Sequence, residues 1–249
     1  MKFLLYKVAR KCINIVWKIM ADVYIASLRM FGMLPKKQLD ELKSTEKVVY
    51  LTFDDGPSPY TRSLLKILAE YNVKATFFVT GNGDSEIISE IVKEGHSIGN
   101  HTKTHKYADI CFSKENFFSK LYEMENVIKE KTGVRTKLIR FPGGSSNTVS
   151  RFNPKIMTSL AELVQEKGYS YFDWNVNSGD AGKTKISGKV YKNILDGIQT
   201  HDPAVVLQHD VKDYSVAVVR SVIVWGLRRG YTFLPLRENS PTVHHIINN

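Results

Sequence analysis

Cysteine is scarce in this sequence, and its scarcity excludes several kinds of site. The 249 residues include only 2 Cys, Cys12 and Cys111. These two residues form no metal-binding spacing and no disulfide framework. The absence of a Pro-Cys-x-x-Cys motif also excludes the zinc nucleobase deaminases. Cys111 follows an apolar residue near a predicted helix start, and we interpret it as a small buried side chain.

Long hydrophobic runs are also missing, even near the N-terminus. Within residues 3–34 the longest stretch without a charge is about six residues, which is too short for the apolar core of a signal peptide or for a plain membrane span. Polar residues instead recur at helical spacing. They are Lys7, Lys11, Asn14, Lys18, Asp22 and Arg29. Residues 1–35 are therefore predicted to form a basic amphipathic helix that lies in a membrane interface.

Two other structures fit the same N-terminal pattern. One is a helix packed on the domain surface. The other is an uncleaved signal anchor, in which Lys18 and Asp22 neutralise each other at i,i+4 spacing. A translation start at Met20, Met30 or Met33 would remove the segment altogether.

Acidic residues are in deficit, and the deficit is uneven along the chain. The formal net charge is +10, and residues 1–47 hold 10 Lys/Arg against 4 Asp/Glu, a net of +6. The rest of the chain holds 25 against 21, a net of +4. Such a concentrated excess fits an anionic membrane surface better than nucleic acid, for which no motif follows. Residues 36–47 are polar and are predicted to be a linker.

From residue 48 onward, short apolar runs alternate with helical patterns. The predicted strands are 48–53, 75–79, 96–99, 137–141, 169–173, 204–208 and 231–234. The predicted helices are 61–71, 85–94, 114–131, 154–167, 187–199 and 214–229. This alternation predicts parallel strands joined by right-handed crossovers, in an α/β barrel or a doubly wound sheet. A ligand site in such a fold lies at the carboxyl ends of the strands.

Polar residues follow five of the predicted strands, at this one edge of the sheet. The residues at these ends are Asp54 and Asp55, His101 and His105, Arg140, Asp180 (assigned to the end of strand 169–173), and His209. The i,i+4 spacing of the two early histidines predicts that both rings lie on one side of a helical turn, where they can chelate a metal. Residue 102 is Thr, so the HExxH motif of the zincin peptidases is absent.

The adjacent carboxylates in "TFDDGPS" need a positive partner, because like charges in contact are unfavourable. If Asp55 joins His101 and His105 around a metal ion, its charge is neutralised and Asp54 can act beside it as a general base. Gly56 and Pro57 impose the turn that brings both carboxylates into one site. The alternative is an Asx-type turn with two solvated carboxylates.

Five motifs in this order, "TFDDGPS", "HTKTH", "RFPGG", "NSGDA" and "LQH", resemble those of the polysaccharide deacetylases, the NodB homology domains of carbohydrate esterase family 4. The resemblance covers about residues 46–236. It implies an irregular (β/α)7 barrel of mostly parallel strands, with the N-terminal helix as an extension. It further implies a metal-dependent hydrolase that acts on carbon–nitrogen bonds other than peptide bonds and removes N-acetyl groups from N-acetylhexosamines, most plausibly in peptidoglycan.

The resemblance also implies a role for each site residue. Asp55, His101 and His105 would bind one divalent ion, Zn²⁺ or else Co²⁺, Mn²⁺ or Ni²⁺, and Asp54 would be the base. Arg140 would pair with Asp54, and His209, held by Asp180, would be the acid. A backbone N–H near Gly143 would stabilise the oxyanion, and Leu207 of "LQH" would line the substrate site. Taken alone, Arg140 fits a surface ion pair and His209 a core histidine.

Two departures from the family pattern concern the substrate groove. Many members have Tyr where Gly143 stands, and many have Trp where Ala181 follows Asp180. Trp174 is predicted to supply part of the apolar wall instead. The substrate identity is therefore less defined by the sequence than the reaction type.

The expected partners are an acetylated glycan and, through residues 1–35, a membrane surface, with no nucleic acid and with a monomeric protein. We expect the NodB homology domain to span residues 48–236 and to be followed by a C-terminal tail over 237–249. We also expect the protein to face outward in the cell envelope. A cytoplasmic location is the alternative. An O-acetyl esterase of the xylan type, or a non-catalytic glycan-binding module on the same scaffold, would also fit this sequence.

Overall fold

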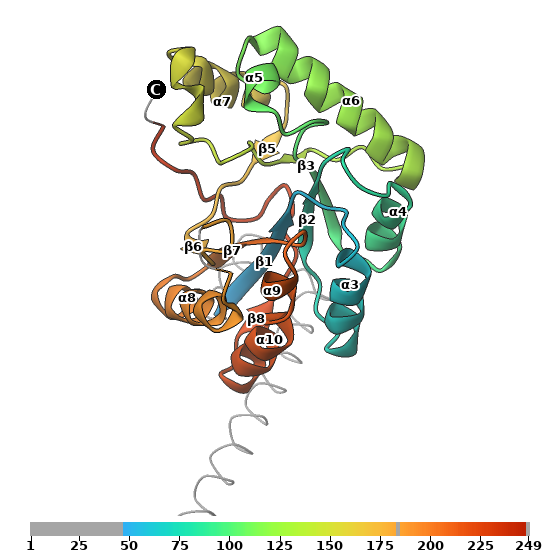
Figure 1. Cartoon of the computed structure of the whole chain (residues 1–249), viewed down its shortest axis with the longest axis vertical. Coiled ribbons are helices and arrows are strands. Elements are labelled where there is room, and N and C mark those ends of the chain that lie inside the picture. Colours follow the sequence, from blue (N-terminus) through green and yellow to red (C-terminus); the bar gives the residue numbers. More distant parts are fainter. Residues whose placement is uncertain (1–46, 183–184, 248–249) are drawn as a thin grey trace, which may run out of the picture. The chain divides into compact units, whose positions relative to one another are not determined.

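A parallel β-sheet organises the fold. The computed structural model describes residues 47–182 and 185–247, and in this part of the chain it contains an eight-stranded sheet. The strands are β1 (Val48–Asp54), β2 (Thr76–Val79), β3 (Ser97–Asn100), β4 (Leu138–Ile139), β5 (Ser170–Tyr171), β6 (Val176–Asn177), β7 (Ala204–His209) and β8 (Thr232–Phe233). Their order is β5-β4-β3-β2-β1-β7-β6, with β8 paired to the start of β1. Every pairing is parallel (Figure 1).

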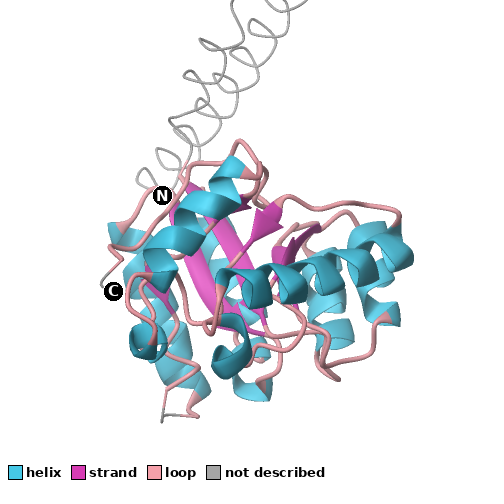
Figure 2. Ribbon diagram, turned by 90° about the horizontal axis from the view of Figure 1, so that it is seen from above, coloured by secondary structure: helices cyan, strands magenta, loops and turns pink. Residues whose placement is uncertain are grey.

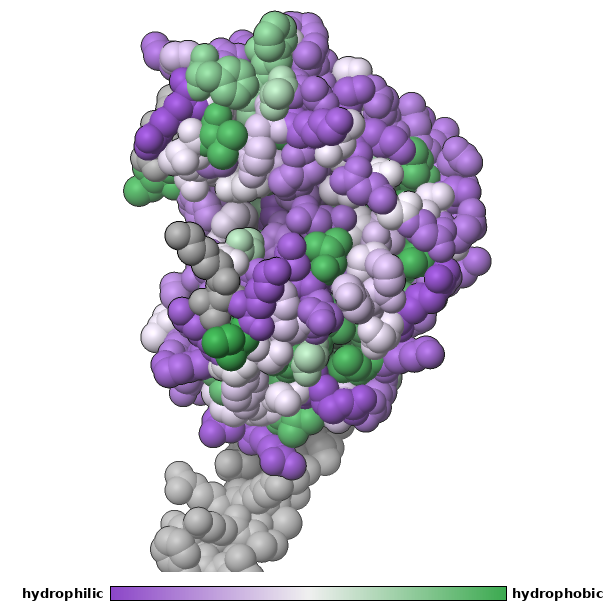
Figure 3. Space-filling model, viewed as in Figure 1, coloured by the Kyte–Doolittle hydropathy of each residue, from purple (hydrophilic) through white to green (hydrophobic). Residues whose placement is uncertain are grey.

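Helices connect these strands and flank them on the outside (Figure 2). They are α3 (Thr61–Glu70), α4 (Glu86–Lys93), α5 (Tyr107–Ile110), α6 (Lys114–Thr132), η2 (Val149–Phe152), α7 (Ile156–Glu166), α8 (Ser187–Thr200), α9 (Asp213–Val216) and α10 (Val219–Arg228). Helix α6 begins where the Ser113 side chain accepts a hydrogen bond from Asn116 N, and it ends at Gly133. The face of the molecule in Figure 3 is mainly hydrophilic, with small separate apolar patches.

Strand β1 shows how the period-two pattern places a polar side chain inside the sheet's concave side. Its odd-numbered residues, Val49, Leu51 and Phe53, belong to the large apolar core shared with the helices. Its even-numbered residues point the other way, because successive side chains of a strand alternate. Tyr50 joins a smaller interior cluster, and Thr52 and Asp54 follow it toward the end of the strand. The alternation therefore delivers the Asp54 carboxylate to the interior.

The fold class is as predicted: an α/β fold with parallel strands in an irregular, curled (β/α) arrangement. The predicted elements are found with shifts of a few residues at their ends. The strand β6 and the short helix α5 were not predicted. The predicted helix 214–229 is wrong, because it is interrupted between α9 and α10. The Ser215 carbonyl there accepts bonds from the Gln208 side chain and from Val218 N.

The predicted N-terminal helix of residues 1–35 and the linker of residues 36–47 lie outside the described residues, apart from Lys47. In the described part of the chain, no helix is both long enough and apolar enough to cross a membrane. The domain limits given above remain predictions.

Candidate active site

The side chains singled out at the strand ends come together at the carboxyl edge of the sheet. Asp54 is the last residue of β1, and Asp55 follows it with a left-handed backbone, φ 73°. His101 follows β3, Arg140 follows β4 and His209 ends β7. Asp180 lies beyond β6, not at the end of β5 as the sequence pattern predicts, because the missed strand β6 carries this segment alongside β7.

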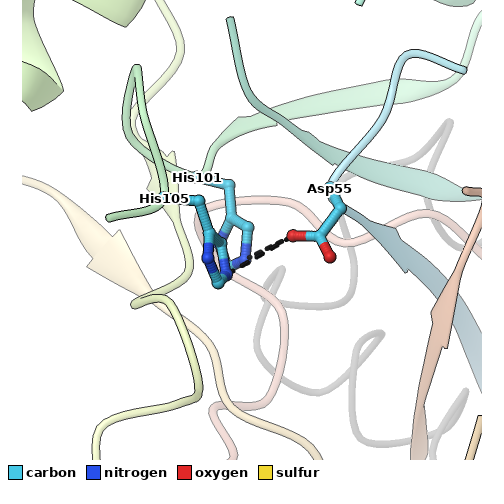
Figure 4. Close-up of side chains that lie close together, drawn as sticks. All are labelled: Asp55, His101 and His105. Carbon is cyan, nitrogen blue, oxygen red and sulfur yellow. Dashed lines mark ion pairs between the residues drawn. The ribbon is translucent and has the colours of Figure 1, made fainter. Parts of the chain in front are cut away.

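Asp55, His101 and His105 form a compact cluster of possible metal ligands. One donor atom from each lies within 4.8 Å of the others. Asp55 Oδ1 is 3.6 Å from His101 Nε2 and 3.4 Å from His105 Nε2. Figure 4 shows the two imidazoles side by side, with the Asp55 carboxylate facing them. These three side chains can share one ion.

The two histidines are not on a helical turn, which corrects the prediction from their spacing. Residues 101–106 form a loop in which Thr102 and His105 have left-handed backbones, φ 66° and 55°. The Asn100 side chain accepts a bond from Thr102 N and donates to the Leu121 carbonyl of α6, so it fixes the start of this loop. The loop still brings the ring centroids of His101 and His105 to 4.9 Å.

The protonation and hydrogen bonding of the cluster suit a metal ion. Burial lowers the pKa of His101 to about 3, although the charge of Asp55 opposes this, so the ring is neutral. Its Nδ1 lies 2.8 Å from the Arg140 carbonyl, which directs Nε2 toward the cluster. The buried Oδ1 of Asp55 has no hydrogen-bond partner in the described part of the chain. Two imidazole nitrogens and a carboxylate oxygen are a typical donor set for catalytic zinc.

Asp54 lies beside this cluster in a buried ion pair with Arg140. Asp54 Oδ1 accepts a 2.9 Å bond from Arg140 Nη1, and Asp54 Oδ2 is 3.8 Å from His101 Nε2. Arg140 is fully buried, and it also donates to the hydroxyl of Thr52 and to the carbonyls of Phe172 and Asp173. Burial raises the pKa of Asp54 above its ordinary value, and the opposing charge of Arg140 does not reverse this.

His209 and Asp180 form a second charged pair on the other side of Asp55. Asp180 makes two 2.7 Å hydrogen bonds with His209: its Oδ2 accepts from the backbone N–H, and its Oδ1 lies at the ring Nδ1. Burial alone would lower the pKa of His209, but the bond to Asp180 and the charges of Asp180, Asp54 and Asp55 raise it to about 9. His209 Nε2 faces Asp55 Oδ2 at 4.0 Å. An imidazole whose charged form is favoured thus points at the cluster of possible metal ligands.

A buried carboxylate that the sequence patterns did not single out supports the loop after β1. Asp210 Oδ2 accepts a 2.5 Å bond from the hydroxyl of Thr61, the first residue of α3. A Cβ at Gly56 would lie only 2.2 Å from this oxygen, so glycine is required for the close approach. Burial raises the pKa of Asp210 to about 7, against the effect of the Thr61 bond. The only feature of the sequence that could have drawn attention to Asp210 is its position directly after His209 in "QHD".

The three predicted substrate residues have different surroundings. Gly143 is exposed, with φ 71°. Trp174 is partly buried, and its ring meets the His245 ring at 4.7 Å, so the C-terminal segment supports it. Leu207 is buried within β7. A cavity of about 660 Å³ opens next to Asp55 between the loops that follow β1 and β2.

Comparison with known proteins identifies similar sequences and structures. The family model described as polysaccharide deacetylase matches residues 41–158. A peptidoglycan-N-acetylglucosamine deacetylase of Bacillus cereus is 33% identical over 78% of this chain and 71% of its own length. A putative polysaccharide deacetylase of Bacillus subtilis is 30% identical, over 80% and 70%. The catalytic domain of a peptidoglycan N-acetylglucosamine deacetylase from Eubacterium rectale superposes with a TM-score of 0.81 and 49% identity, over 82% of this chain and 94% of that one.

Proposed function

Because this chain belongs to the polysaccharide deacetylase family, we propose that it is a metal-dependent hydrolase that removes N-acetyl groups from N-acetylhexosamine residues of peptidoglycan. The observation that carries the proposal is the juxtaposition of three groups. A three-donor cluster lies between a buried carboxylate on one side and a protonated imidazole on the other. This arrangement offers a base and an acid to a single reacting acetamide.

Asp55, His101 and His105 would hold the ion, which we propose to be Zn²⁺. When bound, the ion supplies Lewis-acid chemistry, since it lowers the pKa of water and polarises a carbonyl. The neutral ring of His101 and the unpartnered Asp55 Oδ1 support this assignment. Co²⁺, Mn²⁺ and Ni²⁺ accept the same donors, so metal reconstitution decides among them.

Asp54 is the proposed general base, and it accepts the proton of the attacking water at Oδ2. Its Oδ1 is occupied by Arg140 Nη1, so the guanidinium orients the carboxylate and leaves one oxygen available. The raised pKa of Asp54 makes the carboxylate a stronger base than an ordinary aspartate.

His209 is the proposed general acid, and it gives the proton of Nε2 to the departing amine. Asp180 holds Nδ1 of the same ring and favours the charged form. The amine needs a proton to leave, because an amide anion is too basic a leaving group. The backbone N–H of Gly143 would donate to the acyl oxygen as negative charge develops there. Trp174 and Leu207 would form apolar contacts around the acetyl group.

We also propose an outward-facing location in the cell envelope, where peptidoglycan is found. The net charge of +6 in residues 1–47 would draw this segment to anionic lipid. The Bacillus cereus and Eubacterium rectale relatives are named for action on peptidoglycan, which supports the same substrate here. Fractionation of cells that express a C-terminally tagged chain tests the location, and purely cytosolic material would contradict it.

The direct test is acetate release from N-acetylglucosamine oligomers and from peptidoglycan. Activity should disappear after chelation, return with added Zn²⁺, and be lost in Asp54→Asn. Asp196→Asn on the exposed face of α8 removes the same charge far from the site and is the matched control. Activity that survives chelation, or that persists in Asp54→Asn, would refute the mechanism.

Two further measurements separate the alternatives. Faster release from acetylxylan than from chitin oligomers would favour an O-acetyl esterase. Tight glycan binding without turnover across several divalent metals would favour a non-catalytic module.

A further inference from the structure

The space above Gly143 is already occupied by another part of the chain. A Cβ placed on Gly143 would lie 2.5 Å from the hydroxyl oxygen of Tyr107 and 3.3 Å from the ring carbon that bears it. The 2.5 Å separation is far below van der Waals contact, so a side chain at position 143 and Tyr107 in its present place exclude each other. Tyr107 thus stands where a residue-143 side chain would begin.

Tyr107 reaches this place from the metal-ligand loop. It is the first residue of α5, two positions after His105, and its ring meets the His105 imidazole edge to face at 5.5 Å and 78°. The ring also packs on the apolar cluster that includes Ile110 and Phe117, and this packing restricts its orientation. The side chain therefore bridges the metal-ligand loop and the Gly143 loop.

The hydroxyl of Tyr107 is available for a ligand. Tyr107 is partly buried, yet nothing in residues 47–182 and 185–247 forms a hydrogen bond with its hydroxyl. A tyrosine hydroxyl near apolar surroundings normally finds a partner. Here the hydroxyl lies 2.5 Å from the place that a Cβ on Gly143 would take, and Gly143 is the residue whose backbone N–H is proposed above to bind the acyl oxygen.

We propose that Tyr107 is a substrate-binding residue of this site, whose ring forms the acetyl-pocket wall that Gly143 lacks and whose hydroxyl donates a hydrogen bond to the acyl oxygen. This inference rests on the proposed deacetylase function. Two adjacent donors on one oxygen stabilise developing negative charge more than one does. The ring offers a rigid apolar face to the acetyl methyl group.

The test separates the hydroxyl from the ring. Tyr107→Phe should lower kcat about 10- to 100-fold with KM changed less than about twofold, because the hydroxyl acts mainly as charge develops. Tyr107→Ala should in addition weaken the binding of N-acetylglucosamine oligomers to the metal-depleted protein by up to about tenfold. Tyr122→Phe, a partly exposed tyrosine on α6, is the matched control and should leave both values unchanged.

A second pair of variants tests the shared space. Gly143→Ala should lower kcat in the wild-type background, because its Cβ displaces the Tyr107 hydroxyl and its backbone is strained at φ 71°. In the Tyr107→Ala background the same change should cost less, since the clash with the hydroxyl is gone and only the backbone strain and the 3.1 Å approach to the Cβ of Asn147 remain. Equal costs in both backgrounds would contradict the proposed contact.

The remaining outcomes are also decisive. Wild-type kcat in Tyr107→Phe, or a loss of Zn²⁺ affinity as large as the loss of kcat, would overturn the assignment, because the side chain would then only support His105. A wild-type protein that releases no acetate would refute the proposed function instead. In that case the oligomer-binding comparison with metal-depleted Tyr107→Ala still tests the wall.

Discussion

Asp180→Asn should shift the alkaline limit of activity to lower pH by removing the charge that keeps His209 protonated. The carboxylate accepts from the backbone N–H of His209 and holds its Nδ1, both at 2.7 Å. An asparagine side chain keeps the size of the aspartate but presents one acceptor instead of two. The variant therefore loses the negative charge, which is the main influence that raises the pKa of His209 against the effect of burial.

The size of the effect follows from the pKa of His209. Its rise from 6.5 to about 9 corresponds to roughly 3 kcal/mol in favour of the charged ring. Without Asp180, burial is the largest remaining influence, and the pKa of His209 should fall to 6.5 or below. In the metal-free protein at pH 8 the protonated fraction then drops from about nine-tenths to roughly 3% or less, a loss of about 30-fold. A divalent ion held by Asp55 would lower the pKa of His209 through its own positive charge in the wild type and the variant alike, so the difference between the two proteins measures the effect of Asp180.

The measurement is kcat/KM for acetate release between pH 5 and 10. His209 must be protonated to act as an acid, so activity is lost as pH rises through its pKa. The alkaline limb should move down by about two units in Asp180→Asn relative to the wild type, while the acid limb stays in place. Asp196→Asn should keep the wild-type profile. An unmoved alkaline limb in a folded Asp180→Asn protein would refute the assignment of His209 as the acid.

Three further predictions concern stability and the wall of the site. Burial lowers the pKa of His96 to about 4, so the unfolded state binds more protons between pH 6.5 and 4. Stability should fall by up to about 3 kcal/mol as pH drops through this range, and urea unfolding of His96→Asn should show a smaller pH dependence. Arg140→Ala should cost about 3–5 kcal/mol by the same assay, because it leaves Asp54 buried and unpaired. Arg62→Ala, which breaks an exposed ion pair, should have a much smaller effect. Removal of residues 241–249 should raise KM and change the tryptophan emission, since His245 bonds the Trp174 carbonyl at 2.7 Å and packs on its ring; unchanged KM and emission would show that this segment has no part in the site.

Much of the site could be predicted because it follows strong local patterns. The long strand β1 has a clear apolar run, and its alternation alone places Asp54 in the interior with Thr52. The rule that parallel strands end at one edge then gathers His101, Arg140 and His209 there. These inferences need only the strand positions and the direction of the chain.

The elements that could not be predicted lack such a pattern. Strand β6 has two residues, too few for a period, so Asp180 was assigned to the wrong strand. The loop of His101 and His105 depends on the Asn100 side chain, whose hydrogen-bond partner Leu121 lies 21 residues further along the chain, on helix α6. Asp210 and Thr61 are 149 residues apart, and only the folded chain brings them into contact. The proximity of Tyr107 to Gly143 likewise cannot be predicted from hydrophobic periodicity.

Arg140 limits how this protein can be stabilised by engineering. Buried ion pairs can often be exchanged for hydrocarbon side chains of similar volume with little loss or even a gain in stability. Here the same guanidinium fills the inside of the sheet and holds one oxygen of the Asp54 carboxylate. A thermostable redesign that replaced this pair with methionine and leucine would remove the proposed general base, so stabilising substitutions are better placed on the outer helices.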